Sequence, residues 1–273
     1  MGKNLRAIII GGGSIGKRHS YNLIELGIQT RIVDIDEIGN IDSILQEKFN
    51  MGFVCSPNIN HIEHSNKLAQ YGIPIFCEKP FYTSDKGVDE LLDLINSKDL
   101  ITMVGCNLRF TKEVKSIDPN SKYINVYFGY NLEKWRPQTD HLNSYSANKH
   151  LGGGILLDAI HELDYLYFKF GSIKNISYTK NKLSNVTIDT EDLVVGRIEF
   201  ENGTIADFTL NYLSEEYHRY YDILQDNRLH RVKFEISNQM YIDEIKYFIN
   251  QVANNQPCFN NFKEADYLLR RLV

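Results

Sequence analysis

A chain of 273 residues, with 42% hydrophobic and 24% charged residues, has the composition of an ordinary globular protein and is long enough for one large domain or two modest ones. The formal net charge of −5 argues against a nucleic-acid partner or an anionic membrane surface, because no overall positive field is available to gather phosphates. No stretch approaches the roughly 20 consecutive apolar residues that a membrane-spanning helix requires.

Four cysteines are widely separated and form no C-x-x-C pair: Cys55, Cys77, Cys106 and Cys258. Three of them lie in short apolar runs, so we interpret them as small core residues in a reducing compartment rather than as disulfides or metal ligands. The amino-terminal sequence also lacks the pattern of a secretory signal. The sequence therefore predicts a cytoplasmic protein with no metal site and with neither a membrane nor a nucleic acid as partner.

The first 106 residues alternate short apolar runs with amphipathic helical patterns. Strands are predicted over Leu5–Ile10, Thr30–Val33, Gly52–Cys55, Ile73–Cys77 and Ile101–Cys106. Helices are predicted over Ser14–Leu26, Ile59–Tyr71 and Ser84–Ile95. Strands that alternate with helices indicate right-handed βαβ units and a parallel sheet buried on both faces. The segment from Asp34 to Pro57 is short and leaves room for little more than one helix.

After about Asn107 the pattern changes to strands, several of which alternate polar and apolar residues. These strands are predicted over Tyr123–Tyr130, Ile173–Thr179, Leu193–Phe200, Thr204–Leu210, Arg219–Leu224 and Arg231–Ile236. Helices are predicted over Gly154–Phe170 and Tyr241–Asn254. The turn Glu201-Asn202-Gly203 is typical of a hairpin, because Asn-Gly favours the positive φ of tight turns. The sequence thus predicts a second, α+β domain with a mostly antiparallel sheet.

The sequence GGGSIG, beginning at Gly11, fits the dinucleotide-binding pattern G-x-G-x-x-G between a predicted strand and a predicted helix. Gly11 would make the tight turn, Gly13 would let the backbone approach a pyrophosphate, and Gly16 would allow close packing of helix on strand. The phosphates would sit at the helix amino terminus, at Ser14 and Ile15, where N–H groups favour an anion. A glycine-rich loop without a nucleotide remains the alternative.

Asp34 ends the second predicted strand, where its carboxylate could accept hydrogen bonds from both hydroxyls of a ribose. The same charge would repel a 2′-phosphate, so the sequence favours NAD over NADP. We do not interpret Arg31, three residues earlier, as a phosphate ligand. Ser56 and Glu78, at the ends of the third and fourth strands, are the remaining predicted cofactor contacts.

Lys79, within Glu78-Lys79-Pro80, follows the fourth predicted strand. A lysine at the carboxyl end of a parallel strand points into the ligand crevice of such a sheet. It could contact the cofactor and polarise a substrate hydroxyl or share its proton. On spacing alone, a solvated turn lysine is the favoured interpretation.

Three glycines, Gly152 to Gly154, precede the predicted helix that carries Asp158 and His161. These two residues are three apart and would share one helix face. A carboxylate beside an imidazole can fix the ring and form a proton relay. A buried histidine with a purely structural role is the alternative.

These motifs, together with Asn107–Phe110, occur in the order seen in the Gfo/Idh/MocA family, which contains glucose-fructose oxidoreductase and inositol dehydrogenase. The resemblance covers essentially the whole chain. It implies a Rossmann NAD(P)-binding domain over residues 1–106 and a substrate-binding and dimerisation domain with an open sheet over residues 107–273. It also implies NAD(P)-dependent oxidation or reduction of a sugar, nucleotide sugar or cyclitol. Lys79 would assist catalysis, His161 would accept or donate the proton, and Asp158 would help to hold the substrate.

The chain departs from the family pattern in the spacing of this aspartate and histidine, which most members place four residues apart, and in its short segment from Asp34 to Pro57. Arg109, Trp135, Arg136 and Tyr145 are candidates for the substrate wall, since aromatic faces stack on sugar C–H groups and arginine donates to hydroxyls or carboxylates. A tryptophan that packs in a loop is the alternative for Trp135. The surroundings of Trp135 and Tyr145 resemble a branch associated with bacterial surface-polysaccharide sugars.

Two other functions are compatible with the same residues. An NAD-dependent glycosidase of this fold would oxidise its substrate transiently and release free sugar without net reduction of NAD. A non-enzymatic dinucleotide-binding regulator would bind the cofactor without using Lys79 or His161. The family's exposed sheets often pair, so we also expect a homo-oligomer, either a dimer or a tetramer.

Overall fold

The computed structural model describes residues 5–135 and 144–272, which form two compact units. The first unit comprises the described residues of Met1–Cys106 and of Asn238–Val273, and the second comprises those of Asn107–Ser237. The assignment of everything after residue 106 to one domain is therefore wrong at the carboxyl end. The physical reason is packing, because Phe248 of helix α9 (Gln239–Asn254) lies edge-on against Phe53 and Phe76 of the first sheet.

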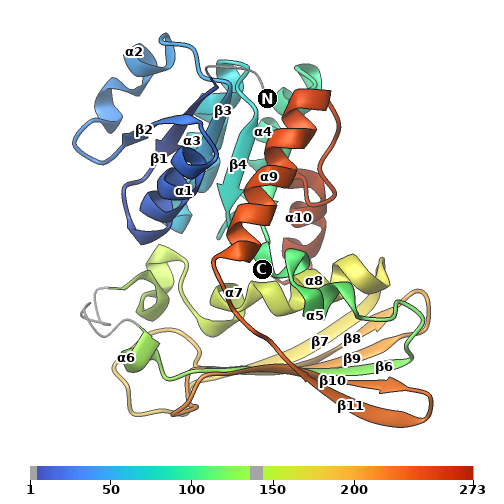
Figure 1. The fold of residues 1–273 in the computed structure, drawn as a ribbon. Coiled ribbons are helices and arrows are strands. Elements are labelled where there is room, and N and C mark those ends of the chain that lie inside the picture. The colour runs from blue at the N-terminus through green and yellow to red at the C-terminus, as the bar shows by residue number, and fades with distance from the viewer. Residues whose placement is uncertain (1–4, 136–143, 273) are drawn as a thin grey trace. The chain divides into compact units, whose positions relative to one another are not determined.

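The first unit contains a five-stranded sheet in the order β2-β1-β3-β4-β5 (Figure 1). Its strands are β1 (Arg6–Ile10), β2 (Gln29–Val33), β3 (Met51–Val54), β4 (Ile75–Glu78) and β5 (Thr102–Gly105). All four pairings are parallel, as the sequence predicts. Strands β1, β3 and β5 are buried almost throughout, which matches their continuous apolar runs.

Helices lie on both faces of this sheet. They are α1 (Ser14–Glu25), α2 (Ile41–Leu45), α3 (His61–Gln70), α4 (Val88–Ser97), α9 and α10 (Phe262–Leu269). His19 of α1 and Phe248 of α9 contact the face that carries Phe53. Leu68 of α3 fills the space where a Cβ on Gly52 would lie. Because neighbouring residues of a strand point to opposite faces, α3 covers the face opposite to that of Phe53. Between β2 and β3 the short connection holds only a 3-10 turn (Ile38–Asn40) and α2, as expected.

The carboxyl-terminal segment also closes one edge of the first sheet. The Val104 N–H of β5 donates to the Asn260 carbonyl across 2.9 Å. The Asn260 side-chain amide in turn donates to the Val104 carbonyl across 2.5 Å. Asn260 is 1% exposed. Residues from the end of the chain therefore satisfy the backbone of the outermost strand.

The second unit contains a six-stranded sheet in the order β11-β10-β6-β9-β8-β7 (Figure 1). Its strands are β6 (Tyr123–Gly129), β7 (Ile173–Asn181), β8 (Leu193–Phe200), β9 (Ile205–Asn211), β10 (His218–Gln225) and β11 (Arg228–Lys233). Every pairing is antiparallel except that of β6 with β9. The predicted hairpin joins β8 to β9, and Gly203 has the expected positive φ of 83°. The predicted fold class is thus confirmed.

One face of this second sheet is covered by helices, and the strands alternate accordingly. Ile124, Val126 and Phe128 of β6 are fully buried, whereas the residues between them are half-buried. The helical elements of the unit are η3 (Asn107–Phe110), α5 (Lys112–Lys115), α6 (Leu132–Trp135), η5 (Tyr145–Ala147), η6 (Lys149–Leu151), α7 (Ile155–Asp158) and α8 (Ile160–Phe170).

The single helix predicted over Gly154–Phe170 is instead two helices. Ala159, between α7 and α8, has φ −99° and ψ 28°, outside the α-helical region, so the regular helix is interrupted there. Asp158 is consequently the last residue of α7, and His161 lies in the first turn of α8. The argument that they share one regular helix face is therefore wrong.

No helix in residues 5–135 and 144–272 combines the length and the apolar character needed to cross a bilayer. Within the same residues, no three side chains of His, Cys, Asp or Glu converge as metal ligands would.

Candidate functional site

The glycine loop between β1 and α1 has the close approaches that its sequence predicts. A Cβ on Gly16 would lie 2.0 Å from the Gly11 carbonyl oxygen, and one on Gly11 would lie 2.5 Å from the Cys55 carbonyl oxygen. Above Gly13, by contrast, no atom lies within 4 Å of an added Cβ. Gly13 precedes α1 without any side-chain cap, and Ser14 and Ile15 form the first turn. The loop thus offers an open backbone and a helix amino terminus to an anion, which fits a pyrophosphate.

Asp34 follows β2 and lies against this loop. Its Oδ2 would be 2.4 Å from a Cβ on Gly12, and its Oδ1 accepts a hydrogen bond from the Ile35 N–H across 3.0 Å. The side chain is exposed. Arg31, two residues before the end of β2, forms ion pairs with Glu37 and Glu47. The structure therefore places the Asp34 carboxylate at the glycine loop, whereas the Arg31 guanidinium is paired with Glu37 and Glu47.

At the carboxyl end of β4, Glu78 and Lys79 are both half-buried. Glu78 Oε1 lies 2.6 Å from Nε2 of His19, a residue of α1 that is fully buried. Lys79 is therefore not a fully solvated turn residue, which weakens the alternative interpretation of it.

Two further histidines hold the neighbouring ends of β3 and β4. The buried ring of His61 lies between the carbonyl oxygens of Ser56 (2.9 Å) and Pro80 (2.7 Å), and His64 Nδ1 lies 2.8 Å from the Ser56 hydroxyl. Burial lowers the pKa of both histidines, and at His61 it outweighs the two carbonyl contacts, which act in the opposite direction. Ser56 is thus fixed by a backbone contact and a side-chain contact beside the loop that carries Lys79.

In the second unit, Asp158 is tied to Tyr212, which follows β9. The Tyr212 hydroxyl donates to Asp158 Oδ2 across 2.5 Å, and the two residues are 3% and 4% exposed. Burial raises the pKa of Tyr212 well above its usual value, and the Asp158 carboxylate and the Tyr145 hydroxyl raise it further. A hydrogen bond with Ser146 acts in the opposite direction. Asp158, Tyr145, Ser146 and Tyr212 therefore form one polar cluster.

Trp135, the last residue of α6, lies beside this cluster. Its ring centroid is 6.0 Å from that of Tyr212 and 5.4 Å from that of Phe128, at tilted angles. Tyr130 and Tyr217 extend the same aromatic group. An aromatic wall next to a buried carboxylate is the combination that proteins use to bind polyhydroxylated ligands.

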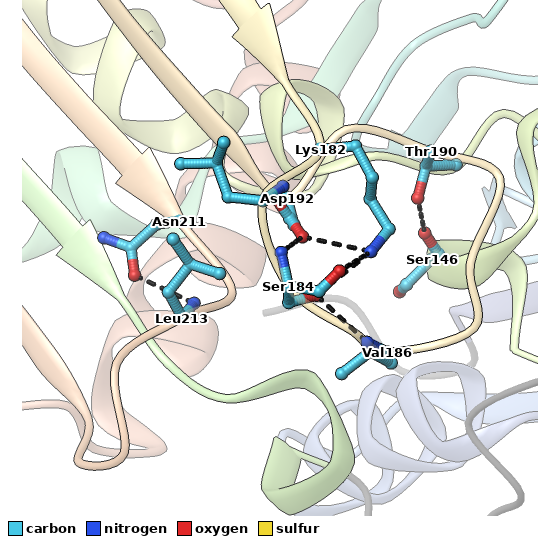
Figure 2. A network of polar contacts seen from close by, with 9 residues as sticks. Ser146, Lys182, Ser184, Val186, Thr190, Asp192, Asn211 and Leu213 are labelled. Atoms are coloured by element: carbon cyan, nitrogen blue, oxygen red, sulfur yellow. Dashed lines mark hydrogen bonds and ion pairs between the residues drawn. The ribbon is translucent and has the colours of Figure 1, made fainter.

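The β7–β8 loop fixes the segment that leads to Asp158. The Thr190 hydroxyl donates to the Ser146 carbonyl across 3.0 Å, as Figure 2 shows. The Glu191 side chain accepts from the Leu156 N–H at the start of α7, and a Cβ on Gly154 would lie 2.5 Å from that carboxylate. Gly154 also has φ +111°, so glycine is needed there for both reasons.

The same loop is organised around Asp192, which is fully buried (Figure 2). Its carboxylate accepts hydrogen bonds from the N–H groups of Leu183 (2.7 Å) and Ser184 (2.8 Å), and Lys182 Nζ lies 3.4 Å away. The Asp192 carbonyl also accepts from the Tyr212 N–H across 2.8 Å. One loop therefore holds both chain segments that meet in the Asp158–Tyr212 hydrogen bond.

Arg109 and His161 both belong to the region around α8: Arg109 is paired with this helix, and His161 lies on its first turn. Arg109 is buried and forms a bidentate ion pair with Asp164 of α8, with distances of 2.8 and 2.6 Å. Its guanidinium also stacks on Phe168 at 4.7 Å. Arg109 is therefore committed to anchoring α8 on η3, rather than presented to a ligand. His161 is 8% exposed on the first turn of that anchored helix. Arg136 lies outside the described residues.

Two sequence models of one oxidoreductase family match this chain. The NAD-binding Rossmann-fold model covers residues 28–106, and the GFO/IDH/MocA carboxyl-terminal domain model covers residues 124–236, so together they match most of the chain. The chain belongs to the Gfo/Idh/MocA family. The sequence resemblance is thereby confirmed.

One curated relative matches the chain over part of its length. The chain is 25% identical over 186 residues to 2,7-anhydro-N-acetylneuraminate hydratase of Mediterraneibacter gnavus, a match that covers 64% of this chain and 49% of that protein. The chain thus spans about half the length of this curated relative.

Solved structures match the fold over nearly its full length. GenD2 from gentamicin A biosynthesis, in complex with NAD, has a TM-score of 0.82, 17% identity, and coverage of 100% of this chain and 93% of that one. Myo-inositol 2-dehydrogenase from Lactobacillus plantarum has a TM-score of 0.80, 18% identity, and coverage of 98% and 94%.

The sequence analysis missed several residues that surround Asp158 and Glu78. Glu191 and Asp192 lie in the β7–β8 loop and Tyr212 follows β9, far in sequence from the motifs. His19 is part of the helix that the glycine motif opens, yet it has no recognisable spacing to Glu78. Only contacts between distant segments assign these residues, so no local pattern could have found Tyr212.

Proposed function

We propose that this chain is an NAD-dependent dehydrogenase that moves a hydride between nicotinamide and a carbinol carbon of a sugar, nucleotide sugar or cyclitol. The observation that carries the proposal is the Asp34 carboxylate against Gly12, at an open glycine loop and a helix amino terminus. In this proposal the first unit binds the cofactor and the second binds the substrate. When bound, NAD supplies the hydride chemistry, while the protein supplies orientation and proton transfer.

The preference for NAD follows from charge. Asp34 can accept hydrogen bonds from ribose hydroxyls, whereas a 2′-phosphate at the same place would meet its negative charge. Arg31 cannot easily compensate, because Glu37 and Glu47 already pair with it. We infer that NADP binds more weakly.

Each candidate residue then has one role. Lys79, at the end of β4, polarises the reacting hydroxyl, and His161 accepts or donates its proton. Asp158, oriented by Tyr212, accepts a hydrogen bond from a substrate hydroxyl. Trp135 and Tyr145 provide a wall for the C–H faces of the ring. The myo-inositol and gentamicin relatives support a polyhydroxylated ring as substrate.

The deciding experiment incubates the full-length chain with sugars, cyclitols and nucleotide sugars, each with NAD and with NADP. We expect absorbance of NADH to rise with at least one polyol and NAD. Release of free sugar from a glycoside without net NADH would instead identify an NAD-dependent glycosidase. Tight NAD binding with no turnover, unchanged by substitution of Lys79 and His161, would identify a regulator.

We also propose that the protein works in the cytoplasm as a homo-oligomer. The four cysteines are free and buried, which suits a reducing compartment. The sheet face opposite α7 and α8 carries half-buried aromatic residues, including the stacked pair Tyr127 and Tyr220, and could pair with a second copy. Measurement of the molar mass in solution tests this, and a monomer at micromolar concentration contradicts it.

A further inference from the structure

His19 is a buried histidine whose side chain contacts the carboxylate of Glu78, a predicted cofactor residue. Its side chain is fully buried on α1, and Nε2 lies 2.6 Å from Glu78 Oε1. Glu78 itself retains some exposure, with 13% of its side-chain surface accessible. His19 is thus enclosed in the core, whereas Glu78 reaches the carboxyl end of the sheet, where sheets of this type bind ligands.

The surroundings of His19 define which nitrogen carries the proton. Nδ1 is buried and has no hydrogen-bond partner among the described residues. Aromatic rings of Phe53, Phe76 and Tyr241 surround the imidazole at centroid distances of 5.6, 5.1 and 6.2 Å. A proton on Nδ1 would be buried without an acceptor, which costs free energy. The geometry therefore assigns a proton to Nε2, which donates to Glu78.

This hydrogen bond joins two segments that are distant in sequence. His19 lies on the helix that starts at the glycine loop, and Glu78 ends β4 and precedes Lys79. A dinucleotide on such a sheet lies on the glycine loop and extends along the carboxyl ends of the strands, where Glu78 is located. A carboxylate held before the ligand arrives loses less conformational entropy on binding than a mobile one.

We propose that His19 is a positioning residue that orients the Glu78 carboxylate for the cofactor and couples it to α1. The inference rests on the proposed function, because it takes NAD as the ligand. His19 touches neither substrate nor cofactor and acts only through Glu78.

The test measures NAD affinity of the full-length chain by calorimetry, without turnover. His19→Phe keeps a flat ring among the aromatic residues and removes the donor, so we expect NAD to bind about ten- to a hundredfold more weakly. His19→Gln retains an N–H donor and should stay within about threefold of the wild type. In a Glu78→Gln background, His19→Phe should add little, because the interaction is already changed.

Phe248→Leu is the matched control, because Phe248 packs on the same Phe53 and Phe76 rings without contacting Glu78. It should lower the melting temperature but leave NAD affinity within about twofold. Equal losses of affinity in Phe248→Leu and His19→Phe would reduce His19 to a packing residue and overturn the proposal. Wild-type protein that binds no NAD would instead refute the proposed function itself.

A measurement on the wild type keeps the inference testable even if His19→Phe does not fold. Nitrogen-15 NMR of the histidine rings distinguishes the two tautomers. We expect the His19 ring to carry its proton on Nε2, with a nitrogen shift that changes when NAD is added. A proton on Nδ1 would contradict the assigned hydrogen bond.

Discussion

The Tyr212 hydroxyl donates a hydrogen bond to Asp158 Oδ2 across 2.5 Å, and both side chains are almost completely buried. Removal of this donor in Tyr212→Phe should raise the substrate KM about tenfold and lower stability by about 1–3 kcal/mol, because Asp158 loses its orienting partner. Steady-state kinetics and thermal unfolding measure the two effects.

Tyr165→Phe is the control, since Tyr165 is fully buried in the same unit and its hydroxyl has no hydrogen-bond partner among the described residues. That substitution should be neutral or slightly stabilising. Equal changes of KM in both variants would mean that Tyr212 has no specific role at the site.

Lys79→Ala should lower kcat about 10²–10⁴-fold while NAD affinity is nearly retained, because the ammonium acts on the reacting oxygen. Single-turnover absorbance at saturating substrate gives the rate, and calorimetry gives the affinity. Lys86→Ala removes an exposed lysine from the following loop and should leave both unchanged. A Lys79→Ala enzyme that turns over at the wild-type rate would exclude this lysine from the chemistry.

His161→Asn should slow turnover and flatten the acidic limb of the rate profile for alcohol oxidation. A histidine that accepts the hydroxyl proton must be neutral, so the wild-type rate should rise with pH through the histidine range, near about 6.5 in an unperturbed side chain. His150→Asn, at an exposed position in the same unit, should keep that limb. Persistence of the limb in His161→Asn, under conditions where hydride transfer limits the rate, would assign the proton to another group.

Asp34→Ala should narrow the difference between the Kd values for NAD and NADP, because the charge that repels the 2′-phosphate is gone. Asp36→Asn removes a charge two residues further along, at another exposed position, and should have a smaller effect. If NADP binds the wild type more tightly than NAD, or if the difference is unchanged in Asp34→Ala, another residue discriminates between the cofactors.

Asp192→Asn should destabilise the second unit by about 1.5–3 kcal/mol at neutral pH. Burial alone would raise the pKa of Asp192, but hydrogen bonds from Ser184, Leu183 and Lys182 outweigh it and hold the pKa below its usual value. A carboxyl with a lowered folded-state pKa stabilises fully above its unfolded pKa of about 3.9 and loses that contribution as the pH falls through the folded value.

The difference in unfolding free energy between wild type and Asp192→Asn should therefore be constant above about pH 5 and shrink at lower pH. Urea titrations at a series of pH values from 3 to 7, in steps of about one half, measure it. A difference that stays constant to pH 3 would show that the charge of Asp192 does not carry the effect.

Sequence patterns predicted the first sheet well because its strands are continuous apolar runs and its helices are single amphipathic stripes. They failed at Ala159, where neither glycine nor proline marks the break between α7 and α8. The residues around Ala159 are typical of a helix, so the turn is not visible in the sequence. Tertiary contacts impose it, among them the hydrogen bond from the Leu156 N–H to Glu191 at the start of α7. Local propensity is a weak prior wherever such contacts decide the backbone.

The candidate site was predictable only where local sequence determines its geometry. The glycine loop and Asp34 follow from a strand, a turn and a helix in direct succession, and the structure brings them together. Arg109 was assigned to the substrate on its motif, but a carboxylate 55 residues away engages it. Tyr212 and His19 gain their partners only through folding, so their importance cannot be deduced from spacing.

The interrupted first unit has a consequence for how this chain could diversify. Residues 107–237 form one uninterrupted segment whose removal would leave the Phe53, Phe76 and Phe248 cluster and the Asn260–Val104 pairing intact in the remainder. Recombination at these two junctions could therefore join a different second unit to an unchanged first unit. A fragment that stops at residue 106 would instead expose those aromatic rings and the bare edge of β5, and would be prone to aggregate.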